Sequence, residues 1–105
     1  MNQKPKTKSF REYLLENLSD SAQAAEYINA ALQEKDAEFL LTALRDVAEV
    51  RGGMSKLSRA TKLNRSNLYH ALSSKGDPGV RTLEKVLHVF GLRLSVMPEM
   101  AKRAA

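Results

Sequence analysis

The chain has no cysteine among its 105 residues. Disulfide bonds and thiolate metal sites are therefore excluded. Without such cross-links, the stability of the chain depends on its apolar core. This length suits one domain that buries roughly two-thirds of the surface of its unfolded chain. The lack of cysteine also fits a reducing compartment, and we expect a cytoplasmic protein.

Long apolar runs are also missing. No stretch approaches the roughly 20 apolar residues that a membrane-spanning helix needs. The chain starts with the basic segment from Lys4 to Lys8, but no apolar segment of a secretory signal follows it. We therefore expect neither a membrane-spanning segment nor a secretory leader.

The sequence patterns of common enzyme sites are missing too. The chain has no phosphate-binding glycine loop and no nucleophile elbow. Its two histidines, His70 and His88, fall in separate predicted helices and are not spaced as a metal-binding pair. We therefore expect no enzymatic activity, no catalytic residue, no cofactor and no metal site.

Charge is spread unevenly along the chain, which carries a net charge of +5. Residues 12–50 hold nine acidic and two basic side chains, whereas residues 51–105 hold eleven basic and three acidic ones. A basic half suits a polyanion, because each phosphate contact releases condensed counterions. An acidic half suits either solvation or a basic protein partner.

Apolar residues recur at helical spacing along most of the chain, which predicts an all-α fold. Ser9 and Glu12 have the spacing of a capping box, and Ser19 or Asp20 is placed to cap the next helix. Besides the pair of short helices described below, the expected helices span residues 9–18, 20–35, 36–51 and 80–90.

Residues 53–72 are the most informative part of the chain. They predict two short helices, Met54–Thr61 and Arg65–Leu72, joined by a tight turn of three residues from Lys62 to Asn64. This spacing is typical of a DNA-binding helix-turn-helix, and Asn64 stands where the second helix needs an N-cap. The predicted apolar contacts between the two helices come from Leu57, Leu63, Leu68 and Leu72.

The second of these helices presents a polar outer face, and a helix is the element that fits a major groove. The predicted contacts to DNA bases are Arg65, Ser66, Asn67 and His70. The predicted contacts to DNA phosphates are Ser55, Lys56, Arg59, Tyr69, Lys75 and Arg81. Three alternatives stay open: Arg65 contacts only phosphate or solvent, Asn67 caps its own helix, and Tyr69 fills the core.

The C-terminal part predicts a strand. Leu92, Leu94 and Val96 alternate with Arg93 and Ser95, which is the period of a half-buried strand. A strand has to pair, and no second strand is predicted, so we expect the same strand of a second copy to pair with it and to form a homodimer.

These expectations divide the chain into a mobile basic N-terminus, residues 1–8, a single helical DNA-binding domain, residues 9–97, and a frayed tail, residues 98–105. The domain in turn consists of N-terminal helices in 9–51, the helix-turn-helix in 53–72 and a closing helix with the strand in 80–97.

Several segments together carry a family resemblance. They are Tyr13-Leu14, Ala25–Leu32, Phe39–Leu41, Leu44–Ala48, Gly53–Ser58, Asn64–Leu72, Thr82–Leu87 and Gly91–Val96. From Asp36 onward the chain resembles lambda-repressor-like helix-turn-helix proteins and, more narrowly, the probable addiction module antidote family of bacterial antitoxins. It departs from the family at Ser58, where alanine is common, and at Lys62, where glycine is common. A left-handed Lys62 costs on the order of 1 kcal/mol.

The resemblance implies a small toxin partner of the RelE-like ribonuclease class. It implies an antitoxin that silences this toxin and represses its own operon by binding operator DNA as a dimer. The N-terminal helices offer a possible toxin-binding face, with Phe10, Tyr13, Leu14 and Leu18 on one amphipathic helix. Packing of these four side chains within the protein itself is the alternative. Two other functions stay open: a stand-alone phage-type repressor, and a protein-binding adaptor that keeps the helix-turn-helix as a scaffold.

Overall fold

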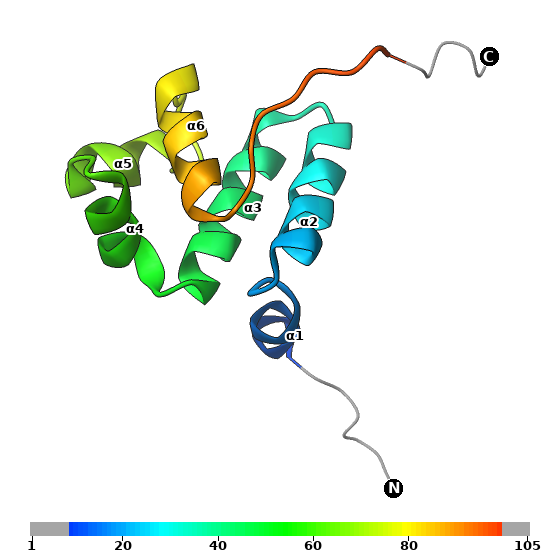
Figure 1. The fold of residues 1–105 in the computed structure, drawn as a ribbon, viewed down its shortest axis with the longest axis horizontal. Coiled ribbons are helices and arrows are strands. Elements are labelled where there is room, and N and C mark those ends of the chain that lie inside the picture. Colours follow the sequence, from blue (N-terminus) through cyan, green and yellow to red (C-terminus); the bar gives the residue numbers. More distant parts are fainter. Residues whose placement is uncertain (1–8, 100–105) are drawn as a thin grey trace, which may run out of the picture.

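The computed structural model describes residues 9–99, which form an all-helical fold, as predicted (Figure 1). Residues 1–8 and 100–105, for which we predicted a mobile segment and most of a frayed tail, lie outside the described residues. The six helices are α1 (Phe10–Asn17), α2 (Ser21–Gln33), α3 (Ala37–Val50), α4 (Gly53–Thr61), α5 (Arg65–Ala71) and α6 (Val80–Val89). No helix within residues 9–99 combines the length and the apolar character needed to cross a membrane.

Local hydrogen bonds fix where the helices begin. The backbone N–H of Glu12 donates to Ser9 Oγ and that of Ser9 donates to Glu12 Oε1, which confirms the capping box of α1. Asp20, and not Ser19, caps α2 by accepting a hydrogen bond from the backbone of Gln23. These starts could be predicted because an N-cap depends only on residues within one turn of it.

The core lies around α3, which packs against α1, α2 and α4, while α4 also packs against α5 and α6. Its largest fully buried side chains are Leu18, Leu44, Val47, Leu68, Leu72, Val86 and Phe90. Two large apolar residues of these helices, Leu32 and Phe39, are exposed. Both lie close to the turn between α2 and α3, where the ends of a helical hairpin extend past the core.

Arg51 joins three helix ends. It is the C-cap of α3, its Nε donates to the carbonyl of Leu18 at 3.4 Å, and its Nη2 donates to the carbonyl of Phe90 at 3.3 Å. Leu18 and Phe90 are the C-caps of α1 and α6. Because the C-terminal end of a helix carries partial negative charge, a guanidinium is favourable there. The N-terminal helices are thereby tied to the closing helix.

The predicted strand at residues 92–96 is not formed, and residues 9–99 contain no strand at all. The backbone N–H of Leu92 donates to the carbonyl of Leu87 at 2.8 Å, and the chain then continues without regular structure past α6 and α2 (Figure 1). A strand is defined by its pairing, and the described part of a single copy offers no partner strand. Val96 is consequently 97% exposed.

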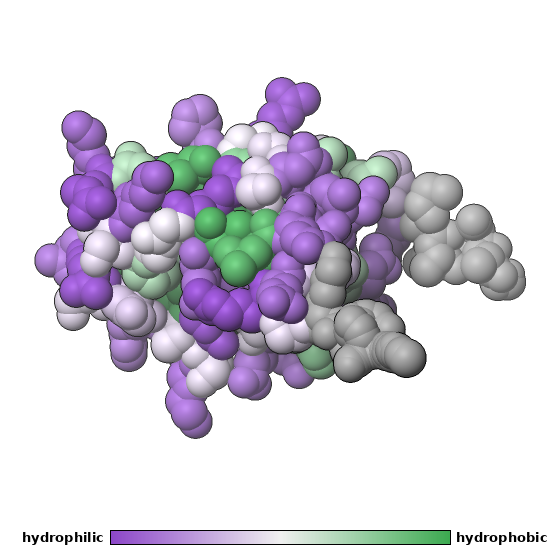
Figure 2. All heavy atoms as spheres, turned by 90° about the horizontal axis from the view of Figure 1, so that it is seen from below, coloured by the Kyte–Doolittle hydropathy of each residue, from purple (hydrophilic) through white to green (hydrophobic). Residues whose placement is uncertain are grey.

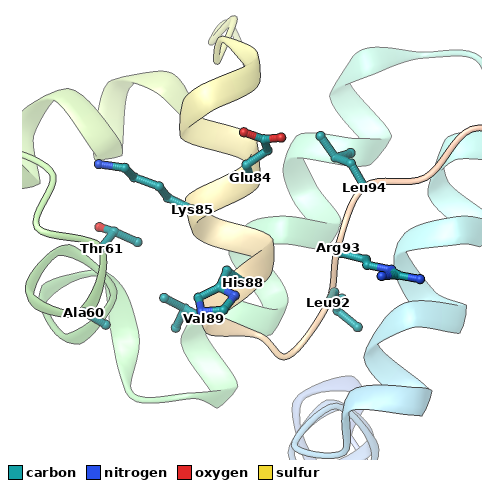
Figure 3. A pocket seen from close by; sticks show the side chains of 9 residues that line it. All are labelled: Ala60, Thr61, Glu84, Lys85, His88, Val89, Leu92, Arg93 and Leu94. Carbon is teal, nitrogen blue, oxygen red and sulfur yellow. The ribbon is translucent and has the colours of Figure 1, made fainter.

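A hollow lies on each side of this C-terminal segment. One, of about 430 Å³, lies between α4, α6 and the segment, and Figure 3 shows Leu92 and Leu94 at one edge of it with His88 and Val89 of α6. The other, of about 250 Å³, lies against α2 and is lined in part by Leu32, Leu94 and Met97. The segment therefore leaves apolar surface uncovered on both sides.

Candidate nucleic-acid interface

Helices α4 and α5 pack against each other as the sequence predicts. Leu57, Leu68 and Leu72 are buried, and Leu63 in the turn is partly buried against the core. These leucines fix how α5 is rotated about its axis, because the buried pair Leu68 and Leu72 lies one helical turn apart on the inner face. The opposite face of α5 is consequently directed outward.

Two hydroxyl groups fasten the turn between α4 and α5. Ser58 Oγ donates to the carbonyl of Leu63 at 2.6 Å. Thr61 Oγ1 donates to the carbonyl of Leu57 at 2.8 Å and accepts from the backbone N–H of Leu63 at 3.3 Å. Alanine at position 58 could not make this bond, so the departure from the family pattern has a structural consequence. Thr61 was missed in the sequence, where a threonine at the end of a helix gives no distinct signal.

The turn contains a left-handed residue. Lys62 has φ of 63° and ψ of 24°, and its N–H donates to the carbonyl of Ser58 at 2.8 Å. Asn64 then caps α5, because its Oδ1 accepts the N–H of Asn67 at 2.9 Å. The predicted N-cap is confirmed, and the Asn67 side chain is not used to cap its own helix.

The outward face of α5 carries all the polar side chains that the sequence places there. Arg65, Ser66, Asn67 and His70 are exposed. Tyr69 is 51% exposed, so the alternative that it fills the core is wrong. The guanidinium carbon of Arg65 lies 5.4 Å from the centroid of the Tyr69 ring.

Three of the predicted base contacts share one hollow with a predicted phosphate contact. Ser66, Asn67, His70 and Lys75 line a hollow of about 520 Å³, together with Ala71 and Asp77. Asp77 was missed in the sequence, because only the fold of the loop after α5 brings it here. A carboxylate at this place could accept a hydrogen bond from the amino group of cytosine. Arg65 does not line this hollow.

The phosphate candidates on α4 and α6 do not line this hollow. Ser55 and Lys56 lie in the first turn of α4, whose N-cap Gly52 provides no side-chain acceptor for the first amides. Such a helix start favours an anion. Arg59 on α4 and Arg81 on α6 are exposed, but neither lines the hollow of Ser66 and His70.

Contacts from outside the pair of helices hold the C-terminal end of α5. Arg45 of α3 donates through Nη1 to the carbonyl of Leu72, the C-cap of α5. Gly76 lets the following loop approach α5, since a Cβ at this position would lie 2.0 Å from the carbonyl oxygen of Ala71. Arg45 was not among the predicted site residues; its possible signal was that it is one of only two basic residues in residues 12–50.

The four candidate toxin contacts on α1 separate into two groups. Leu14 and Leu18 are buried within the core and are not available to a partner. Phe10 is 63% exposed, Tyr13 is 48% exposed, and their rings are stacked with centroids 6.3 Å apart. Figure 2 looks at the end of the molecule where α1 lies and shows a small apolar patch among hydrophilic residues.

Within residues 9–99, no three histidine, aspartate or glutamate side chains are grouped so that they could hold a metal ion.

Comparison with known proteins identifies the family. The sequence profile of the family described as probable addiction module antidote protein matches residues 7–98. An uncharacterized protein of Haemophilus influenzae (strain ATCC 51907 / DSM 11121 / KW20 / Rd) is 37% identical over 81 residues, which cover 77% of this chain and 82% of that protein. No solved structure matches the chain. The family resemblance seen in the sequence is confirmed, and this chain belongs to the probable addiction module antidote proteins.

Proposed function

We propose that the protein is a DNA-binding antitoxin that neutralises a RelE-like toxin and represses its own operon as a dimer. The observation that carries the DNA-binding part is the outward face of α5, where Arg65, Ser66, Asn67 and His70 are all exposed. Membership of an antidote family supports the toxin-directed part. The protein acts in this proposal by binding and not by catalysis.

In the proposed complex, α5 enters the major groove, which is wide enough for one helix. The planar guanidinium of Arg65 matches the O6 and N7 acceptors of guanine. Asn67 has a free side-chain amide that suits adenine, because the cap of α5 comes from Asn64. Lys75 at the hollow and Lys56 at the start of α4 would contact phosphates, and such contacts set the register of the helix on the DNA.

The proposed dimer forms through the C-terminal segment. Leu94 and Val96 are exposed, and the backbone groups of residues 93–98 belong to no helix or strand. Pairing with the same segment of a second copy would satisfy these backbone groups and would cover the apolar hollows beside them. A two-fold dimer places two recognition helices about one turn of DNA apart, roughly 34 Å, over a palindromic operator.

The proposed toxin contact lies at the other end of the protein, on α1. The Phe10–Tyr13 stack is exposed and belongs to an acidic half of the chain. The neighbouring cation Arg11 is already paired with Glu49 of α3. This end would therefore attract a basic protein, and two exposed aromatic rings are typical of the side chains that dominate binding energy.

Operator binding tests the DNA-binding part. Arg65→Ala should weaken binding to DNA from upstream of its own operon by about 1–3 kcal/mol and relax base preference at one position. Lys35→Ala removes the same charge at the distant turn between α2 and α3 and should have little effect. If Arg65→Ala loses the same affinity for every DNA sequence, Arg65 contacts only phosphate. A wild-type protein without any sequence preference would overturn the proposed repressor.

Co-expression with the small open reading frame beside its own gene tests the toxin-binding part. Restored growth and co-purification of the two proteins are expected, and Tyr13→Ala should weaken the complex without changing DNA binding. Operator binding without any rescue would favour a stand-alone repressor instead.

A further inference from the structure

We infer that Tyr69 is a positioning residue whose ring holds the Arg65 guanidinium ready for a base edge. This inference rests on the proposed function, because it takes α5 as the helix that enters the major groove. The part of Tyr69 that positions Arg65 is the aromatic ring and not the hydroxyl group. The sequence had suggested either a contact between Tyr69 and a phosphate or a place for its ring in the core.

The geometry of α5 brings the two side chains together. Residues four apart on a helix are neighbours on its surface, and the guanidinium carbon of Arg65 lies 5.4 Å from the Tyr69 ring centroid. That distance is within the range of a cation–π contact. The Asn64 cap at one end of α5 and the bond from Arg45 to Leu72 at the other keep the helix that carries both side chains in place.

The stack leaves the hydrogen-bonding edge of Arg65 unused. Among the described residues, Arg65 makes no hydrogen bond and no ion pair, so Tyr69 is the partner that orders it there. A cation–π contact uses the charge of the guanidinium and not a hydrogen-bond acceptor, so the five N–H donors of Arg65 stay available to a base. The stack therefore restricts a long side chain before binding, which lowers the entropy lost when the fork meets guanine.

The stack also explains why Arg65 is separate from the other candidate base contacts. Ser66, Asn67 and His70 share the hollow with Lys75, whereas Arg65 and Tyr69 lie along the adjoining side of the helix. Among the described residues, no polar side chain forms a hydrogen bond or an ion pair with Arg65, and the Tyr69 ring orients it instead. Lysine at position 65 could not replace the planar fork.

Binding measurements with full-length protein test this inference. Duplexes enriched from a random library by the wild-type protein serve as the probe, and Arg65→Ala identifies the base pair whose discrimination depends on Arg65. Tyr69→Ala should lose discrimination at that same base pair by about three- to tenfold. Tyr69→Phe, which keeps the ring and removes the hydroxyl, should behave like the wild type. The double variant should be no worse than Arg65→Ala.

A second readout requires no DNA. The side-chain δ protons of Arg65 should show an upfield ring-current shift in the NMR spectra of the wild type and of Tyr69→Phe, and lose it in Tyr69→Ala. Three outcomes would overturn this inference and leave the proposed function intact. They are an equal loss of discrimination in Tyr69→Phe and Tyr69→Ala, additive losses in the double variant, and the absence of the ring-current shift. If the wild type enriches no duplex, the proposed function fails and the inference with it.

Discussion

Lys62 adopts a backbone conformation that usually belongs to glycine. Its φ of 63° is left-handed, and the residue is exposed, so no side-chain contact offsets the backbone cost. Lys62→Gly should therefore raise the free energy of unfolding by about 0.5–1 kcal/mol, which is the left-handed penalty less the extra entropy of glycine in the unfolded chain. Urea denaturation followed by circular dichroism measures the change.

The matched control for this substitution is Lys85→Gly. Lys85 lies inside α6 and is also exposed, but its backbone is helical. Glycine should there cost about 1 kcal/mol. A similar destabilisation at both positions would show that the left-handed turn carries no strain.

Gly76 is required by a close approach of two backbones. A Cβ would lie 2.0 Å from the carbonyl oxygen of Ala71, and a main-chain atom cannot move aside like a side chain. Gly76→Ser should lower the free energy of unfolding by about 1–3 kcal/mol and loosen the loop that carries Lys75. Gly79→Ser is the control, because a Cβ there meets nothing within 4 Å and serine is a good N-cap for α6. Equal stability of the two variants in urea denaturation would contradict the close approach.

The residues of the candidate site could be predicted to different extents. The outward positions of α5 follow from helical periodicity, since Leu68 and Leu72 had to face the core. Arg45 and Asp77 depend on contacts between segments far apart in the chain, and no local pattern marks them.

At the scale of elements, helix starts were predictable and the strand was not. Asp36 and Asn64 cap their helices through hydrogen bonds within three residues, so the sequence around each start contains the whole interaction. The alternation from Leu92 to Val96 is a real pattern, but a strand also needs a second strand, and residues 9–99 of one copy do not provide it. The alternation therefore identified a segment with one apolar side, but it could not show whether that segment forms a strand in a single chain.

The pairing of α2 with α3 includes a hydrogen bond that should be visible as a pH dependence of stability. The phenol of Tyr27 donates to the carboxylate of Asp46. Burial, the hydrogen bond and the charge of Asp46 together hold the pKa of Tyr27 well above its ordinary value of 10.0. Removing the hydroxyl in Tyr27→Phe should lower the free energy of unfolding at neutral pH by about 1 kcal/mol.

The direction of the pH effect follows from the raised pKa. Below about pH 10 the phenol is protonated in both the folded and the unfolded chain, and the full stabilisation is present. At higher pH the unfolded chain loses this proton while the folded chain keeps it, so the free energy of unfolding falls. Urea denaturation between pH 7 and pH 11 should show a smaller fall for Tyr27→Phe than for the wild type. Tyr69→Phe, at an exposed position on α5 that takes no part in this hydrogen bond, is the control and should keep the wild-type slope.

At the scale of the whole molecule, the two charge classes belong mainly to two different groups of helices. The acidic residues belong mainly to α1, α2 and α3, and the basic residues mainly to α4, α5, α6 and the C-terminal segment. Arg51 ties these two halves through the carbonyls of Leu18 and Phe90. One small core can therefore support a surface suited to phosphates and a separate surface suited to a basic protein.

The proposed dimer gives the last prediction. Val96 is 97% exposed, so Val96→Asp should leave the fold and thermal stability of a single copy unchanged while placing two like charges close together in a paired ribbon. We expect the wild type to sediment as a dimer and Val96→Asp to shift to the monomer with weaker operator binding. Ser95→Asp adds the same charge on the opposite side of the segment and should remain a dimer. A monomeric wild type, or equal dimerisation of both variants, would show that the segment does not pair. The two copies of α5 in the proposed complex would then need another contact to hold them one DNA turn apart.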